Sequence, residues 1–211
     1  METELKILYL DDSVAVCVKP AGVDSQDGMC RLLSEQCGGT FFCVHRLDKA
    51  VGGVMVYARS AAAATALSRA VAENAVEKTY LAVCEGVPDP TQGAMRELLY
   101  HDASKNKTYV VQRQRKGVRE AVLDYETLEA REGLSLVRVR LHTGRSHQIR
   151  VQFASRRLPL VGDGRYGAKT RGEIALWSHA LAFPHPVTGE LLRFTAPPPE
   201  RPPWTDMENA R

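Results

Sequence analysis

The sequence lacks any uninterrupted apolar run near the roughly 20 residues that a membrane-spanning helix requires. Its first residues, METELKILYLDDS, place no basic segment before a long apolar stretch, so a secretory signal is not predicted either. The five cysteines are odd in number and form no CxxC pair, which disfavours a zinc site and a set of disulfides. We therefore expect a cytoplasmic protein with reduced thiols and no bound metal.

The composition also lacks the features of a disordered or fibrous chain. Of the 211 residues, 44% are hydrophobic and 25% are charged, as in an ordinary folded protein. The length suits one large domain or two small ones, and no boundary is sharp enough to divide the chain. Residues 195–211, TAPPPERPPWTDMENAR, hold five of the eleven prolines and cannot continue a helix or a central strand. We predict one domain over residues 1–196 and a proline-rich surface tail over 197–211.

Strand-like patterns outnumber helical ones. β-Branched and aromatic residues cluster or alternate in six segments: 6–10, 14–18, 53–57, 79–84, 121–128 and 134–141. Helical and strand-like segments are interspersed without the strict alternation of a doubly wound fold. The pattern therefore favours an α+β domain built on a largely antiparallel sheet.

Two helices are predicted. Ser60 is a suitable N-cap for an alanine-rich run whose apolar residues, from Ala63 to Val71, recur at helical spacing. A second helix is predicted over residues 146–157, with Phe153 toward the core and Arg150 on another side.

Positive charge is concentrated, although Lys and Arg exceed Asp and Glu only by 28 − 25 = 3. A first basic block, residues 103–119, contains no acid and six cations: Lys105, Lys107, Arg113, Arg115, Lys116 and Arg119. A second basic block, residues 138–157, holds six arginines and two histidines, again without an acid. One such block is equally well explained as a solvated surface. Two of them favour a partner with a phosphate backbone.

One segment places an acid among bases. His45, Arg46 and Lys49 flank Asp48, and a glycine pair follows between two apolar runs. A carboxylate held among cations stays ionised and can act as a nucleophile or as a base. A loop salt bridge is an equally open interpretation of Asp48.

A second constellation is LHTGRSHQIRV, residues 141–151. A turn over residues 143–146 leads into the predicted helix, whose first N–H groups attract anions. Arg145 and Arg150 supply guanidinium forks that suit a phosphate or the loop carboxylate. His147 is open between an RNA contact and an ordinary buried hydrogen-bonding residue.

Together these motifs resemble the RluA-type pseudouridine synthases. The resemblance is carried, in order along the chain, by VAVCVKPAGV, HRLDKAVGG, VEKTYLAVCEG, LHTGRSHQIRVQFASRRLPLVGDGRYG and WSHALAFPHPVTGELLRFTAPPP. It implies a pseudouridine synthase fold: an α+β domain with a bent, mixed but mainly antiparallel central sheet, flanking helices and loops, and a central RNA-binding cleft. It covers nearly all of residues 1–196, which would be the catalytic domain.

The resemblance also implies roles for single residues. Asp48 would be the essential aspartate, Tyr80 the active-site tyrosine, Arg150 the basic partner of Asp48, and Arg46 an aid to base flipping. Further RNA contacts are expected at His45, Arg145, His147, Lys105, Lys107, Arg113, Arg115 and Lys116. The reaction detaches uracil from the anomeric carbon of the ribose and rejoins it through C5, without a cofactor or a metal. The expected partner is structured ribosomal or transfer RNA, the uridine stays unspecified, and the working expectation is a monomer.

The sequence departs from the family pattern at two places. Val51 and Gly52 stand where the family usually has Thr-Ser, and Val18 stands where an amide residue commonly precedes the lysine. These changes leave open a catalytically impaired, RNA-binding member of the family. A nucleoside or sugar hydrolase that uses the same aspartate is a third alternative, which the two basic blocks disfavour. The presence of Asp48, Tyr80 and Arg150 favours the enzyme.

Overall fold

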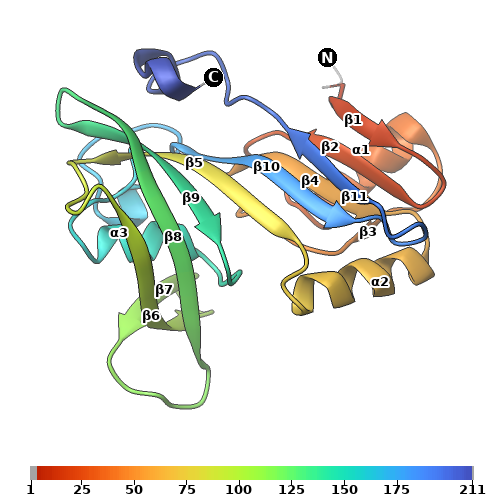
Figure 1. Ribbon diagram of the computed structural model, residues 1–211, viewed down its shortest axis with the longest axis horizontal. Helices are drawn as coiled ribbons and strands as arrows, with labels where there is room; N and C mark the ends of the chain where they lie inside the picture. Colours follow the sequence, from red (N-terminus) through yellow and green to blue (C-terminus); the bar gives the residue numbers. More distant parts are fainter. Residues whose placement is uncertain (1–3, 211) are drawn as a thin grey trace. The chain divides into compact units, whose positions relative to one another are not determined.

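The computed structural model describes residues 4–210, which form two compact units (Figure 1). The first unit comprises the chain up to Lys78 together with Ser178–Ala196, and the second comprises Thr79–Trp177 and the residues from Pro197 on. The chain therefore changes unit at three points, which follow Lys78, Trp177 and Ala196. The first two lie inside strands and leave no loop or linker composition, so the sequence contained no signal for them. The third coincides with the start of the proline-rich segment.

An antiparallel sheet forms the first unit. Its strands are β1 (Ile7–Leu10), β2 (Val14–Lys19), β3 (Phe42–Cys43), β4 (Gly52–Ala58), most of β10 (Leu176–Pro184) and β11 (Leu191–Thr195). The order is β1-β2-β4-β10, with β11 on β10 and β3 on β4. The pairs β1–β2, β2–β4, β3–β4 and β10–β11 run antiparallel.

Helix α2 (Ala61–Ala72) confirms the first helix prediction. The Ser60 hydroxyl oxygen accepts the Ala63 N–H at 3.1 Å and so caps the helix. Ala63, Leu67 and Ala70 are buried at helical spacing and join the valines of β2 and β4 in one core. Helix α1 (Asp27–Cys37) was not predicted, because only Met29 and Leu33 of its largely polar sequence are buried.

Long antiparallel strands form the second unit. They are β5 (Glu77–Glu85), β6 (Gln92–Asp102), β7 (Lys107–Val111), β8 (Val118–Arg131) and β9 (Leu134–Leu141), in the order β5-β9-β8-β6-β7. The pairs β6–β7, β6–β8 and β8–β9 run antiparallel. Much of the first basic block therefore lies on strand β7 and on the loops that join it to β6 and β8. In Figure 1 the loop from β7 to β8 is the lowest part of the view.

The second predicted helix is shorter than expected. Helix α3 spans Gln148–Ala154, and its N-cap is His147, in the left-handed conformation at φ 54°. The residues from Gln148 to Phe153 are all buried, including Arg150. The prediction that Arg150 lies away from the core was therefore wrong, and the ion pair described below explains how its charge is tolerated there.

The proline-rich end lies largely at the surface and packs through a few buried side chains. It forms two short 3-10 helices, η2 (Trp204–Asp206) and η3 (Glu208–Ala210), in which Trp204 and Ala210 are buried. The Asn209 N–H donates to the Glu129 carboxylate on β8 at 3.1 Å. Prolines exclude regular strands and helices, but they do not prevent burial of the side chains between them.

The predicted α+β class is confirmed. Each of the six predicted strands coincides with an observed strand, and β3 lies in the apolar, strand-like run that precedes the Asp48 motif. Strands β6, β7, β10 and β11 were missed. Within residues 4–210, no helix is long and apolar enough to cross a membrane.

Candidate functional site

The loop that carries Asp48 joins β3 to β4 and is held by the segment that follows β2. The Ser25 hydroxyl donates to the Leu47 carbonyl at 2.8 Å and accepts the Leu47 N–H at 3.1 Å. The Gly22 N–H donates to the Lys49 carbonyl at 2.8 Å. The backbone is thus fixed on both sides of Asp48, which limits the positions that its carboxylate can occupy.

Lys19, at the end of β2, strengthens the same attachment. Its side chain is fully buried, and Nζ donates to the carbonyl oxygens of Pro20, Val23 and Lys49 at 2.9, 2.7 and 3.2 Å. Burial lowers the pKa of Lys19 to about 8, against the opposing effect of the Asp48 charge and a neighbouring carboxylate. The three N–H groups of an ammonium match the three carbonyl acceptors.

The charges around Asp48 differ from those predicted. Arg46 and Lys49 are exposed, and Asp48 is half-buried. His45 is not a third cation, because burial and the nearby Lys78 charge lower its pKa to about 3. Its Nε2 accepts the Val56 N–H at 3.3 Å, which requires the neutral ring. A neutral, hydrogen-bonded His45 is a poor phosphate ligand, so its predicted RNA contact gains no support.

Val51 and Gly52, which stand where the family usually has Thr-Ser, are buried. Val51 packs into the core, and its N–H closes a turn on the Asp48 carbonyl at 2.8 Å. Gly53 follows with φ at +123°, and a Cβ there would lie 2.2 Å from the carbonyl oxygen of Ser178 on β10. Only glycine allows this approach of the two strands. The end of the loop is therefore set by packing and backbone contacts.

In the second unit, Arg150 forms a buried ion pair. Its Nε and Nη2 donate to the two carboxylate oxygens of Asp163 at 2.7 and 2.9 Å, and the residues are 5% and 1% exposed. The guanidinium also lies over the ring of Tyr166, at 5.1 Å from the centroid. Sequence reasoning identified Arg150 but assigned no role to Asp163 or Tyr166, although both lie in the GDGRYG segment that carried part of the resemblance.

Tyr166 connects several of the predicted residues. Its hydroxyl accepts the Thr108 N–H at 2.8 Å and forms a second hydrogen bond, of 2.9 Å, with His147 Nδ1. Lys107 lies over the same ring, at 5.5 Å from the centroid. His147 is buried, and its bond to Tyr166 supports the alternative interpretation as a buried hydrogen-bonding residue.

The turn over residues 143–146 is organised by Gln148, for which the sequence favours a buried hydrogen-bonding role like that of His147, and the structure confirms it. Its side-chain oxygen accepts the Thr143 hydroxyl at 2.8 Å and the Arg145 N–H at 3.0 Å. Its amide nitrogen donates to the Val122 carbonyl on β8 at 3.1 Å. The turn and the start of α3 are therefore locked to the sheet.

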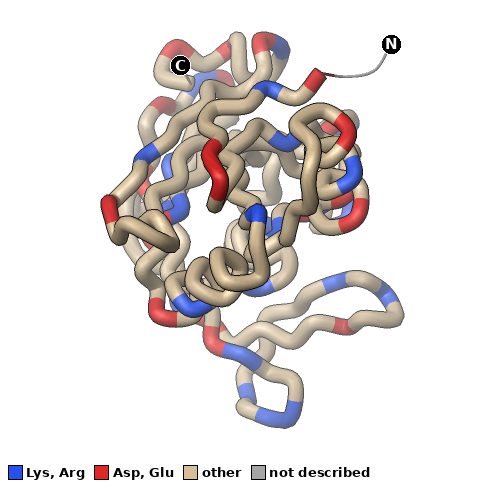
Figure 2. The backbone as a smooth tube through the Cα atoms, turned by 90° about the vertical axis from the view of Figure 1, so that its right-hand side faces the viewer, with Lys and Arg blue, Asp and Glu red and all other residues tan. Residues whose placement is uncertain are grey.

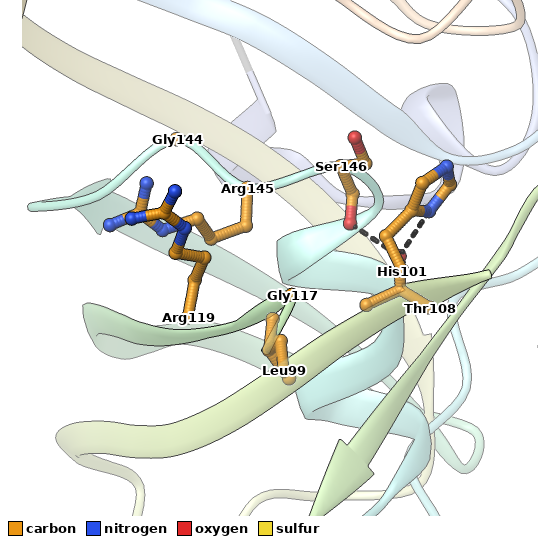
Figure 3. Close-up of a pocket in the computed structure, with 8 residues that line it drawn as sticks. All are labelled: Leu99, His101, Thr108, Gly117, Arg119, Gly144, Arg145 and Ser146. Carbon is orange, nitrogen blue, oxygen red and sulfur yellow. Dashed lines mark hydrogen bonds between the residues drawn. The ribbon is translucent and has the colours of Figure 1, made fainter. Parts of the chain in front are cut away.

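A pocket of about 190 Å³ opens beside this turn (Figure 3). It is lined by Leu99, His101, Thr108, Gly117, Arg119, Gly144, Arg145 and Ser146. Figure 3 shows the Arg119 and Arg145 side chains at the same side of the pocket. Arg145 Nε donates to the Glu120 carbonyl at 2.9 Å, which holds the guanidinium at the rim. Two guanidinium groups at one pocket suit an anion such as a phosphate.

The two basic blocks differ in their surroundings. In the second block, Arg138, Arg150 and Arg156 pair with carboxylates from other elements: Glu126, Asp163 and Glu97. The first block lies mainly on strand β7 and its two flanking loops, where Arg113, Arg115 and Lys116 are exposed. Its Lys105 is 4.0 Å from the carboxylate of Asp102, the last residue of β6. Figure 2 shows Lys and Arg positions on the loops that project at the lower right of the view. The first block therefore remains the better candidate for a phosphate-binding surface.

Tyr80 lies on β5 and is buried. Asp48 belongs to the first unit, whereas Tyr80 and Arg150 belong to the second. The convergence of these three side chains on one pocket therefore stays a prediction.

Among residues 4–210, no three His, Cys, Asp or Glu side chains lie close enough to hold a metal ion. The absence of a cofactor from the reaction also stays a prediction.

Comparison with known proteins identifies the family. Residues 13–155 match the family described as RNA pseudouridylate synthase. The chain is 35% identical to an uncharacterized RNA pseudouridine synthase of Mycobacterium bovis, over 92% of this chain and 70% of that protein. It is also 35% identical to the ribosomal large subunit pseudouridine synthase D of Xanthomonas campestris, over 93% of this chain and 66% of that protein. The chain belongs to the RNA pseudouridine synthases, a family of isomerases that act on RNA.

Solved structures show the same fold. The human RNA pseudouridylate synthase domain containing 1 superposes with a TM-score of 0.83 at 24% identity, over 96% of this chain and 86% of that chain. The human RNA pseudouridylate synthase domain containing 4 gives 0.78 at 23% identity, over 92% of this chain and 89% of that chain. The predicted family and the predicted pseudouridine synthase fold are confirmed.

Proposed function

We propose that this protein converts specific uridines of structured RNA to pseudouridine, with Asp48 as the essential carboxylate. Tyr80 packs on the uracil and assists removal of the C5 proton, and Arg150 keeps Asp48 ionised and oriented. The observation that carries this proposal is the attachment of the Asp48 loop by Lys19, Gly22 and Ser25. Such fixation is what a carboxylate that must meet one ribose carbon requires.

The atom balance of the reaction is consistent with the absence of a cofactor. The bond between uracil N1 and ribose C1′ breaks, and a bond between C5 and C1′ forms. C5 loses a proton and N1 gains one, so nothing is oxidised or reduced. Asp48 either attacks C1′ or removes a proton from the adjacent ribose carbon, and a fixed, ionised carboxylate serves both routes.

A uridine in a stem or a structured loop reaches such a carboxylate only when it is extruded. Arg46 is exposed beside Asp48 and suits the role of filling the vacated stack. The first basic block and the pocket at Arg119 and Arg145 supply phosphate contacts. The name of the Xanthomonas relative favours ribosomal RNA as the substrate, with transfer RNA as the alternative. The protein acts in the cytoplasm as a monomer.

The test uses the C5–H bond that the reaction must break. Total RNA labelled with 5-tritiated uridine is prepared from cells that lack the gene and is incubated with the protein. We expect tritium release by the wild type and none by Asp48→Asn. The matched control is Asp12→Asn, an exposed aspartate of the same unit, which should release tritium at the wild-type rate. Pseudouridine mapping of the same RNA then identifies the modified position.

Release of tritium by Asp48→Asn at the wild-type rate would refute the assignment of the aspartate. A wild-type protein that binds this RNA but releases no tritium would instead be the catalytically impaired, RNA-binding member of the family.

A further inference from the structure

Asp163 holds Arg150 in a single orientation. The bidentate contact joins Nε and Nη2 to both carboxylate oxygens at 2.7 and 2.9 Å, and both residues are almost fully buried. Tyr166 covers a face of the same guanidinium. We propose that Asp163 is a positioning residue for the isomerisation, acting through Arg150. This inference depends on the proposed function, in which Arg150 orients the catalytic carboxylate.

The geometry of the Arg150 guanidinium explains how the Asp163 carboxylate would orient it toward the Asp48 carboxylate. A guanidinium has a side edge, formed by Nε and one Nη, and an end edge, formed by the two Nη atoms. Asp163 takes the side edge of Arg150. Asp163 therefore fixes the plane of the Arg150 guanidinium and, with it, the direction of the end edge. The proposed pairing with Asp48 would use this end edge. Rotation of that plane would displace the partner carboxylate from the reacting carbon.

Asp163 is itself held firmly by the backbone. Its carbonyl accepts the N–H groups of Tyr166 and Ala168 at 3.0 and 3.2 Å, in the turn that forms η1 (Gly164–Tyr166). The same turn holds the connection between β6 and β7, because Arg165 Nη1 donates to the Lys105 carbonyl at 3.0 Å. The carboxylate therefore stands on a segment that is anchored independently of Arg150.

The test measures the chemical step and not only stability. Single-turnover tritium release is followed with enzyme in excess over labelled RNA, and rates are corrected for the folded fraction measured by circular dichroism. We expect Asp163→Asn to lower the rate by about 100-fold with RNA affinity unchanged, since a displacement of about 1 Å costs that much. Asp163→Glu keeps the charge and should retain more activity than Asp163→Asn.

A double-mutant cycle separates positioning from structural support. If Asp163 acts only through Arg150, then Arg150→Ala and the double variant Arg150→Ala/Asp163→Asn should release tritium at the same rate, within about twofold. The control for general destabilisation is Val139→Ala, a fully buried residue of β9, which should keep the wild-type rate in its folded fraction. Should Asp163→Asn not fold, Asp163→Glu provides a second comparison, because it keeps the buried charge while its extra methylene shifts the guanidinium, so its rate should still fall below that of the wild type.

The outcomes distinguish this inference from the proposed function. A wild-type rate for folded Asp163→Asn or Asp163→Glu, together with loss of activity in Asp48→Asn, would overturn the role of Asp163 alone. A further loss of rate on adding Asp163→Asn to Arg150→Ala would show a role independent of Arg150 and would also overturn it. If the wild type releases no tritium from RNA that it binds, the proposed function fails and this inference fails with it.

Discussion

Lys19 offers the sharpest test of how the Asp48 loop is held. The substitution Lys19→Met keeps the length and apolar volume of the side chain and removes the ammonium group. In the wild type that group donates to three carbonyl oxygens, of which two belong to Pro20 and Val23 and the third to Lys49. The Lys49 carbonyl also accepts the Gly22 N–H, so it keeps one donor in the variant.

The magnitude follows from this count. Two partly buried carbonyls, those of Pro20 and Val23, lose their ammonium donor. Each buried group that is left unsatisfied costs about 1–3 kcal/mol. Removing the buried ammonium offsets part of this loss, because its burial is unfavourable enough to lower the pKa of Lys19. We expect the free energy of unfolding to fall by about 2–4 kcal/mol. The rate of tritium release by the folded protein should fall as well, since the Asp48 loop loses one of its attachments.

The assay is urea unfolding followed by circular dichroism, with Lys6→Met as the control. Lys6 is exposed in the same unit, so its substitution should change the free energy of unfolding by less than about 0.5 kcal/mol. Equal unfolding midpoints for Lys19→Met and Lys6→Met would refute the structural role assigned to the buried ammonium.

Two further predictions follow from the glycine of the loop and from the first basic block. Gly53→Ala should unfold the protein or destabilise it far more than Gly38→Ala. The φ angle is positive at both positions, but the added Cβ meets Ser178 at position 53 and open space at position 38. Similar thermal midpoints for the two variants would contradict this prediction. Neutralising Arg113, Arg115 and the neighbouring lysine of the β7–β8 loop should weaken RNA binding and flatten its dependence on salt by roughly one slope unit per lost phosphate contact. Single-turnover tritium release at saturating RNA should stay near the wild-type rate, and an unchanged salt slope would show that the loop does not contact phosphates.

The sequence alone identified the family and the six strands whose β-branched and aromatic residues cluster or alternate. Clustered β-branched residues predicted β2 and β4, and alternation predicted β9. A strand buried on both faces forms a continuous apolar run, whereas a strand with one buried face alternates. The HRLDK motif placed Asp48 in a loop between apolar runs, where the structure also has it. These are local properties, which neighbouring residues determine by themselves.

The charge state and the partners of the candidate residues were decided by the tertiary structure. His45 reads as a base beside Asp48, yet burial and the charge of Lys78 make it neutral. In the sequence, Arg150 is one of six arginines in a block without acids. In the structure it forms an ion pair with Asp163, 13 residues further along the chain. A pKa depends on desolvation and on charges that are close in space, and neither follows from spacing along the chain.

Packing decided the remaining features. The sequence predicts a surface tail at the proline-rich end, and only the fold shows that Trp204 and Ala210 are buried in the second unit. Lys19 appears in the sequence as a lysine in an early turn, and only the fold brings the Lys49 carbonyl, 30 residues away, to its ammonium group. Local pattern thus determined which segments form strands and which motif carries the aspartate. Long-range hydrogen bonds and burial determined what holds that aspartate, because such contacts join residues that are far apart in the chain.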